Sequence, residues 1–367
     1  MKNTKEQISS FVFMFSIGCF IQSSAILMGF VSSITKQDSW IVTIIGFILT
    51  LPIIWLYISL SAKFPGKSLI EINDIVFGKI AGKIFSVLYI FFFFSLSFLN
   101  SNIAEGFVIS SLMPETPKII ISVFFVFLCC YAVRKGVETM TRCSTLFIFI
   151  VCVVMITNAV VLINLLKLSN FQPLFDLPLI KYIQGTQIQI FLPFSEMIVF
   201  FMLFPDLKRP KDIKKPMFLG LIIGALTFFI IITRDIAILG PMIAYMSYPA
   251  YDTVRLIDFG DVLTRMEFFY VALLIMLLFF KVSILIYAVV KGLEQIFKLS
   301  SYKILVPVIG VLVIFFSLTV FDSESEATYW GSNVAAVYST FFELVLPLTT
   351  LIVASLRGFK KPVGANI

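Results

Sequence analysis

Residues 191–201 read FLPFSEMIVFF, so a proline and a glutamate lie inside a segment that is otherwise apolar. Pro193 has no backbone N–H to donate, and it leaves carbonyl groups about one turn earlier without their helical partner. Glu196 follows one turn later. Backbone groups without partners and carboxylates are tolerated at membrane depth only where they line protein or a hydrated cavity. If this segment crosses a membrane, it is a discontinuous helix beside an internal site.

The composition indicates that the segment does cross a membrane. Of 367 residues, 59% are hydrophobic and 13% are charged, and the mean hydropathy is +1.03. A soluble domain carries about 25% charged residues, so the apolar side chains must face lipid. We predict an all-α integral membrane protein with the lipid bilayer as its surroundings.

The residue types present exclude several kinds of chemistry. The chain contains no histidine, which is the commonest metal ligand and general base in proteins. It also shows no nucleophile–base pair and no phosphate-binding loop. We therefore expect no metal, no cofactor and no enzymatic activity.

Ten apolar windows are candidates for membrane-spanning helices, which need about 20 residues each. We interpret the whole chain, 1–367, as a single transmembrane domain with one repeat at about 8–166, a second at about 182–356 and a short cytoplasmic tail at 357–367. The windows are 8–35, 39–62, 84–104, 119–133, 143–166, 182–205, 216–233, 266–290, 304–321 and 327–356.

Basic residues are concentrated in alternate connections between these windows. If both termini are cytoplasmic, 20 of the 28 Lys and Arg residues lie on the cytoplasmic side and six lie outside. This asymmetry follows the positive-inside rule. It predicts cytoplasmic termini, and it accounts for the formal net charge of +7 without a nucleic-acid partner.

Two sets of five helices of opposite orientation are typical of the inverted-repeat transporter fold (LeuT/APC type), in which the first helix of each repeat is interrupted near the midplane. This rule predicts breaks in helices one and six. Helix one has Gly18 near its middle, followed by Gln22, Ser23 and Ser24, and helix six has Pro193 and Ser195 near its middle. We therefore predict one interruption at Gly18 and another at Pro193, with helix-end dipoles that favour an ionic or zwitterionic ligand.

Ionisable residues inside the predicted spans mark a candidate site, because such residues are costly in a membrane. Glu196 needs a partner, and Lys281 in the eighth predicted helix is the only basic residue of comparable depth. We predict an ion pair between them. Glu343 in helix ten and Glu105 in helix three are further candidates for pairing or coupling. The alternative is that the ion pair serves only to fix helix packing.

The central site of this fold is enclosed by helices one, three, six and eight, so polar residues of these helices are expected to converge there. The candidate ligand-binding residues are Gly18, Cys19, Ser23, Asn100, Asn102, Pro193, Ser195 and Glu196.

Three stretches carry a family resemblance. They are FPGKSLIEINDIVFGKIAGKI (64–84), YAVRKGVETMTRCSTLF (131–147) and FSEMIVFFMLFPDLKRPKDIKK (194–215). Together with the chain length and the ten predicted spans, they resemble the B subunits of GerA-type spore germinant receptors, which belong to the amino acid–polyamine–organocation transporter superfamily. The resemblance covers essentially the whole chain.

The resemblance implies a location, partners and a ligand. The location is the inner membrane of a dormant endospore, and the partners are an A subunit and a lipoprotein C subunit. The ligand is a small germinant, typically an amino acid, in the transporter-like central site. The resemblance also places the helix-one break of the family at Gly18 and its helix-six glutamate at Glu196.

The sequence leaves two functions open. In the first, a receptor subunit binds a small ligand and signals to partner chains. In the second, a secondary transporter, proton-coupled through Glu196 or another buried carboxylate, carries amino acids or small solutes, and Lys281 takes the place of a sodium ion. A passive water or ion channel is a further alternative. A sensor and a transporter need the same pocket, so the sequence does not separate them.

Overall fold

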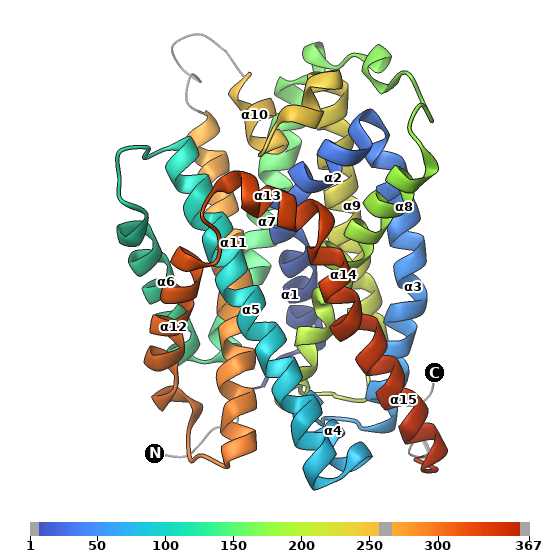
Figure 1. The fold of residues 1–367 in the computed structure, drawn as a ribbon, viewed down its shortest axis with the longest axis vertical. Helices are drawn as coiled ribbons and strands as arrows, with labels where there is room; N and C mark the ends of the chain where they lie inside the picture. The colour runs from blue at the N-terminus through green and yellow to red at the C-terminus, as the bar shows by residue number, and fades with distance from the viewer. Residues whose placement is uncertain (1–6, 257–265, 360–367) are drawn as a thin grey trace.

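The computed structural model describes residues 7–256 and 266–359, and these residues fold almost entirely into helices (Figure 1). The extended pairing in this part of the chain is one parallel backbone bridge between Ile8 and Leu207. Continuous apolar runs become helices because a helix satisfies its own backbone groups in lipid. The all-α prediction is confirmed, and the predicted tail lies outside the described residues from 360 onward.

The first five predicted spans are all helical, and the first of them consists of three segments. They are α1 (Ser10–Ser23) with η1 (Ser24–Leu27) and α2 (Met28–Thr35), then α3 (Ser39–Lys63), α5 (Lys79–Ser111), α6 (Lys118–Lys135) and α7 (Val137–Val161).

The second five spans are also helical, and the first and last of them change helix type along their length. They are α8 (Leu179–Gln189) with η5 (Ile190–Phe194) and η6 (Ser195–Asp206), then α9 (Lys214–Leu239), α11 (Met266–Phe297), α12 (Val306–Thr319), and α14 (Ala335–Thr340) with η10 (Phe341–Val345) and α15 (Leu346–Leu356).

Short helices occupy the connections. Among them are α4 (Leu69–Phe77), α10 (Pro249–Arg255), α13 (Glu324–Asn333), η2 (Lys36–Asp38), η3 (Ile163–Leu165), η4 (Leu168–Phe171), η7 (Gly240–Tyr245) and η9 (Tyr302–Ile304).

The tenth span begins later than predicted. Residues that the sequence assigned to its start form α13, which is bent by 100° from α12. The side chain of Ser323 caps α13 by accepting a hydrogen bond from the backbone of Glu326. This helix carries acidic residues in its first turn, which favours the membrane surface over its interior, so the span starts at Ala335.

Length and composition alone identify fewer spans than ten. Within the described ranges, seven stretches qualify, or eight if α12 and α13 count as one bent span. One of the seven, Ser10–Lys63, is 54 residues long and contains the first two predicted spans. Two further predicted spans do not qualify by themselves. One is α6, whose 18 residues include Lys118, Arg134 and Lys135, and the other is α12, which has only 14 residues. Both helices run alongside α5 and α11 in the bundle (Figure 1).

The break in helix six lies where the sequence predicts it. The α-helical turns stop at Gln189, a π-helical segment (η5) contains Pro193, and a 3-10 helix (η6) continues to Asp206. A π segment at proline is expected, since the missing N–H removes one bond of the α-helical ladder.

The break in helix one is not at Gly18, and this prediction is wrong. Helix α1 continues through Gly18 to Ser23, and the 3-10 turn η1 follows at Ser24–Leu27. Gly18 instead permits close packing, because a Cβ atom there would lie 3.0 Å from Cγ2 of Ile223 in α9.

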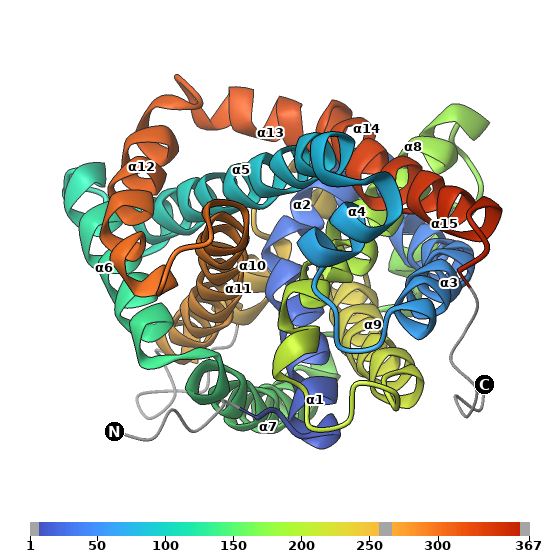
Figure 2. The same cartoon turned by 90° about the horizontal axis from the view of Figure 1, so that it is seen from below.

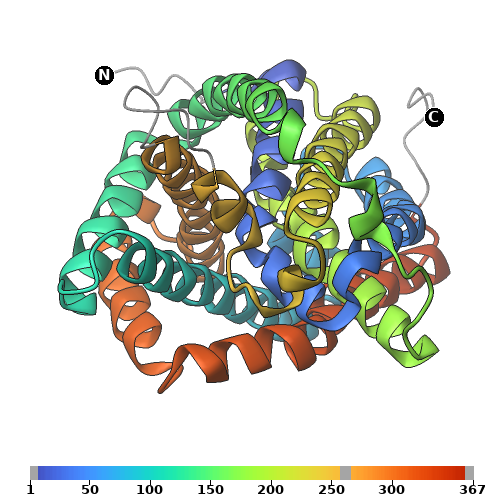
Figure 3. The same cartoon turned by 90° about the horizontal axis from the view of Figure 1, so that it is seen from above.

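Helices α1 and α9 approach each other closely along this face. A Cβ atom on Gly220 would lie 2.7 Å from the backbone oxygen of Met14, and one on Gly224 would lie 2.6 Å from Cβ of Ile21. Seen along the bundle axis, α1 lies between α7, α9 and α11, while α5 and the stretch from α13 to α15 line one side (Figures 2 and 3). Both broken helices are therefore held inside the bundle.

Candidate functional site

Lys281 connects the two helix breaks. Its ammonium group forms an ion pair with the Glu196 carboxylate in the first turn of η6. It also donates a hydrogen bond of 2.7 Å to Oγ of Ser24, the first residue of η1. The Lys281 side chain is fully buried, and its ammonium lies 5.1 Å from the ring centre of Phe20. One cation on α11 therefore holds both interrupted helices.

A third ionisable residue, Glu343, lies close to this ion pair. It belongs to the π segment η10 of helix ten, is fully buried, and lies near enough to Glu196 and Lys281 to interact with both charges. Among the described residues, neither of its carboxylate oxygens has a hydrogen-bond partner. The cluster thus contains two carboxyl groups and one ammonium group.

Sequence reasoning missed Tyr57, which links the breaks of helices six and ten. Its hydroxyl lies 2.6 Å from the backbone carbonyl oxygen of Glu343 and 3.1 Å from that of Ser195, and it donates to these acceptors. The tyrosine is fully buried in α3. The available signal was a polar hydroxyl in the run WLYISL, at a depth where a buried hydroxyl needs a partner.

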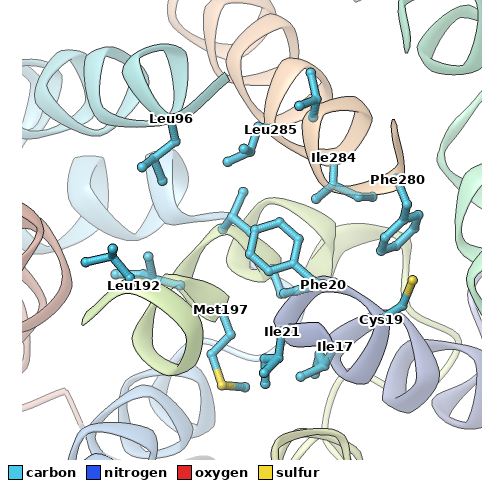
Figure 4. Close-up of a cluster of buried hydrophobic side chains, with 14 of the residues drawn as sticks. Ile17, Cys19, Phe20, Ile21, Leu96, Leu192, Met197, Phe280, Ile284 and Leu285 are labelled. Carbon is cyan, nitrogen blue, oxygen red and sulfur yellow. The ribbon is translucent and has the colours of Figure 1, made fainter. Parts of the chain in front are cut away.

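The space between the breaks is filled by apolar side chains. Figure 4 shows Phe20 of α1 among Leu96, Met197 and Leu285, which come from α5, η6 and α11. Cys19 belongs to the same buried cluster. A ligand at this level would have to displace some of these side chains.

Two predicted serines flank the breaks. The Ser23 hydroxyl donates back to the carbonyl of Phe20 in its own helix. The Ser195 hydroxyl is fully buried and, within the described part of the chain, makes no hydrogen bond. The short segment beside Lys281 therefore contains Pro193, Ser195 and Glu196. The contact of these residues with a ligand stays a prediction.

Two of the predicted polar residues of helix three, Asn102 and Glu105, make their side-chain contacts with α12. Asn100 donates to the carbonyl of Leu96 in its own helix. Asn102 donates to the backbone carbonyl of Ser317 at 2.7 Å, and the Ser317 hydroxyl donates to Glu105 at 2.8 Å. These two residues face α12. From Leu96, which lies at the central cluster, Asn102 is about 9 Å further along the helix.

Asn102 instead lines a separate cavity of about 320 Å³ at the end of the bundle where α10 and α13 lie (Figure 1). Its wall also includes Lys118, Tyr248, Asp322 and Glu324. Burial, with the nearby charge of Glu324, raises the pKa of Tyr248 above its usual range. Its phenol is therefore neutral and able to donate a hydrogen bond. Sequence reasoning missed this cavity, because its wall combines connections far apart in the chain.

Comparison with solved structures identifies the fold. The chain is similar to MhsT in complex with L-phenylalanine, with a TM-score of 0.70, 12% identity and coverage of 99% of this chain and 98% of that one. It is also similar to Mhp1, a nucleobase-cation-symport-1 family transporter in a closed conformation with bromovinylhydantoin bound, with a TM-score of 0.55, 13% identity and coverage of 99% and 95%. These likenesses confirm the LeuT/APC-type transporter fold.

Comparison of sequences identifies the family. Among the relatives, spore germination protein KB of Bacillus subtilis (strain 168) is 28% identical over 330 residues, which are 88% of this chain and 88% of that protein. The sequence model described as "Spore germination protein" matches residues 4–325. Because this match extends over more than half of the sequence, the chain belongs to the family of spore germination proteins.

Proposed function

We propose that this chain is the ligand-sensing membrane subunit of a spore germinant receptor and that its ligand is a small nutrient germinant, an amino acid. The observation that supports this most directly is the double contact of Lys281 with Ser24 and Glu196. A charged group of a ligand between the breaks would compete with Lys281 for Glu196. Binding would then release the broken part of helix one from that of helix six. This movement can be transmitted to partner chains.

The physical requirement of a sensor is two states with different affinity for the ligand. The closed state is favoured by the Lys281 contacts and by Phe20, which fills the centre. A ligand that binds only the open state shifts the population towards it, and a ligand of equal affinity for both states signals nothing. The bound L-phenylalanine of the MhsT structure supports an amino acid as the ligand class.

The assembly and location follow the same proposal. The chain works with A-type and C-type receptor subunits in the spore inner membrane, with both termini in the cytoplasm. The name of the related spore germination protein KB and the excess of Lys and Arg in alternate connections support this arrangement.

The first test is binding of radiolabelled amino acids to the purified chain in proteoliposomes. We expect saturable binding without accumulation, and we expect Glu196→Gln to weaken it at least about tenfold, because a ligand ammonium loses its carboxylate partner. The matched control is Glu138→Gln, which removes a carboxylate from the surface pair with Arg142. Unchanged binding by Glu196→Gln would show that Glu196 serves helix packing alone.

A second candidate function, proton-coupled transport, is favoured by Glu343. Two carboxylates and one ammonium would leave a net charge in a fully buried cluster, which is costly. A proton on Glu343 would remove this charge, and its release during a transport cycle would couple solute movement to a pH gradient.

We expect Glu343→Gln to change the free energy of unfolding by less than about 1.5 kcal/mol, because a glutamine has nearly the shape and charge of a protonated glutamate. Thermal unfolding in detergent measures this change. In the same proteoliposomes, gradient-driven accumulation that the variant abolishes would establish transport and exclude a pure sensor. A large loss of stability would instead show that Glu343 is ionised and paired.

A further inference from the structure

A basic groove lies at the end of the bundle where α1 starts and η6 leads into α9. Its volume is about 650 Å³. Four basic residues and one acidic residue line it, so its formal charge is positive. They are Arg209, Lys211, Lys214, Lys215 and Asp212.

The four basic side chains are exposed, and within the described ranges none of them forms an ion pair. Lys214 also lies over the ring of Trp55, 5.3 Å from its centre. No side chain caps the first turn of α9, which begins at Lys214. The groove therefore concentrates positive charge that the protein itself does not neutralise.

Apolar side chains of the membrane-spanning helices also line the groove. Phe11 and Met14 of α1 and Leu219 of α9 line it, and Phe11 is 60% exposed while Leu219 is 45% exposed. A soluble anion would gain no binding free energy from contact with these apolar side chains. A molecule with a phosphate at one end and hydrocarbon at the other matches both the basic and the apolar lining, and a membrane protein is surrounded by such molecules.

We propose that this groove binds the phosphate headgroup of an anionic phospholipid, with the start of its acyl chains against α1 and α9. Each basic residue near a membrane surface contributes favourably to binding of anionic lipid, and four of them converge here. The site is separate from the Lys281 cluster.

The position of the groove gives the lipid a structural effect. The backbone N–H of Ile8 donates to the carbonyl of Asp206 at 2.8 Å, and that of Lys208 donates to the carbonyl of Ile8 at 2.9 Å. These bonds join the start of the first broken helix to the end of the second, next to Ser10 and Arg209 of the groove lining. A bound lipid stabilises this junction.

Native mass spectrometry of the purified chain with phosphatidylglycerol, and with phosphatidylcholine of the same acyl chains, tests the proposal. We expect retention of phosphatidylglycerol in preference. The quadruple Gln variant of the four basic residues is expected to bind it on the order of 100-fold more weakly. The control variant removes the same charge from exposed positions elsewhere on this end of the bundle, namely Lys79, Lys83, Lys135 and Lys303.

Equal losses in the two quadruple variants would overturn the proposal, because they would indicate attraction to the general surface charge. A further variant, Phe11→Ser, keeps every charge and is expected to weaken lipid binding. If glycerol phosphate binds as tightly as the lipid and Phe11→Ser has no effect, the groove is a site for a soluble anion and the lipid proposal fails. Size-exclusion profiles and helical circular dichroism identify variants that do not fold.

Discussion

Lys281→Met is expected to lower the free energy of unfolding by about 3–5 kcal/mol, the usual cost of removing one partner from a buried ion pair. The methionine has a similar length but no charge, so Glu196 loses its counter-charge and Ser24 loses its donor. No water replaces them readily, because the Lys281 side chain is fully buried. Thermal unfolding of the detergent-solubilised chain should show a decrease of the midpoint on the order of 10 °C.

The double variant Lys281→Met with Glu196→Gln separates the charge effect from the packing effect. Replacing both members of a buried pair by neutral groups of similar volume is often close to neutral for stability. We therefore expect the double variant to recover most of the lost unfolding temperature, while its ligand binding stays at least about tenfold weaker because the Glu196 carboxylate is gone. If Lys281→Met alone unfolds at the wild-type temperature, the cluster is hydrated and the ion pair does not hold the breaks.

Gly29→Ala is expected to open α2, the segment of helix one that follows its break. A Cβ atom on Gly29 in α2 would lie 2.3 Å from the backbone oxygen of Ser247 and 3.0 Å from its carbonyl carbon. Backbone atoms do not rotate away as a side chain does, so α2 or the stretch after η7 must shift. Overpacking of this kind costs about 3 kcal/mol at the upper end of its usual range, which corresponds to a shift of the opening equilibrium on the order of 100-fold.

Hydrogen–deuterium exchange measures this shift, because amide exchange follows the free energy of local opening. The amides of α2 should exchange on the order of 100-fold faster in Gly29→Ala, while those of α11 should stay unchanged. Ser33→Ala is the matched control, since Ser33 is an exposed residue of the same helix. Unchanged exchange in α2 would mean that the contact with Ser247 adapts without opening.

The positions of the helices were predictable from the sequence because lipid imposes a simple rule. Each span must satisfy its own backbone and present apolar side chains, so hydropathy locates it. The break in helix six was also predictable, because Pro193 removes a donor locally. The ion pair between Glu196 and Lys281 followed from the shortage of other partners at that depth.

The break in helix one was not predictable in the same way, because its cause is not local. Gly18 is compatible with a break but serves close packing against Ile223, whereas the chain departs from α-helix at Ser24, which Lys281 contacts from another helix. The direction in which helix three presents Asn102 and Glu105 also depends on where α12 lies. Such rotations are set by tertiary contacts, which no single sequence window contains.

The contacts of Lys281 have a consequence for how such a sensor is tuned. The fraction of molecules in the open state multiplies the apparent affinity for every ligand by the same factor. Residues that only hold Lys281, Ser24 or Tyr57 in place can therefore set the threshold concentration for a response without touching the ligand. Two chains with the same pocket would then recognise the same nutrient and differ only in how much of it they require.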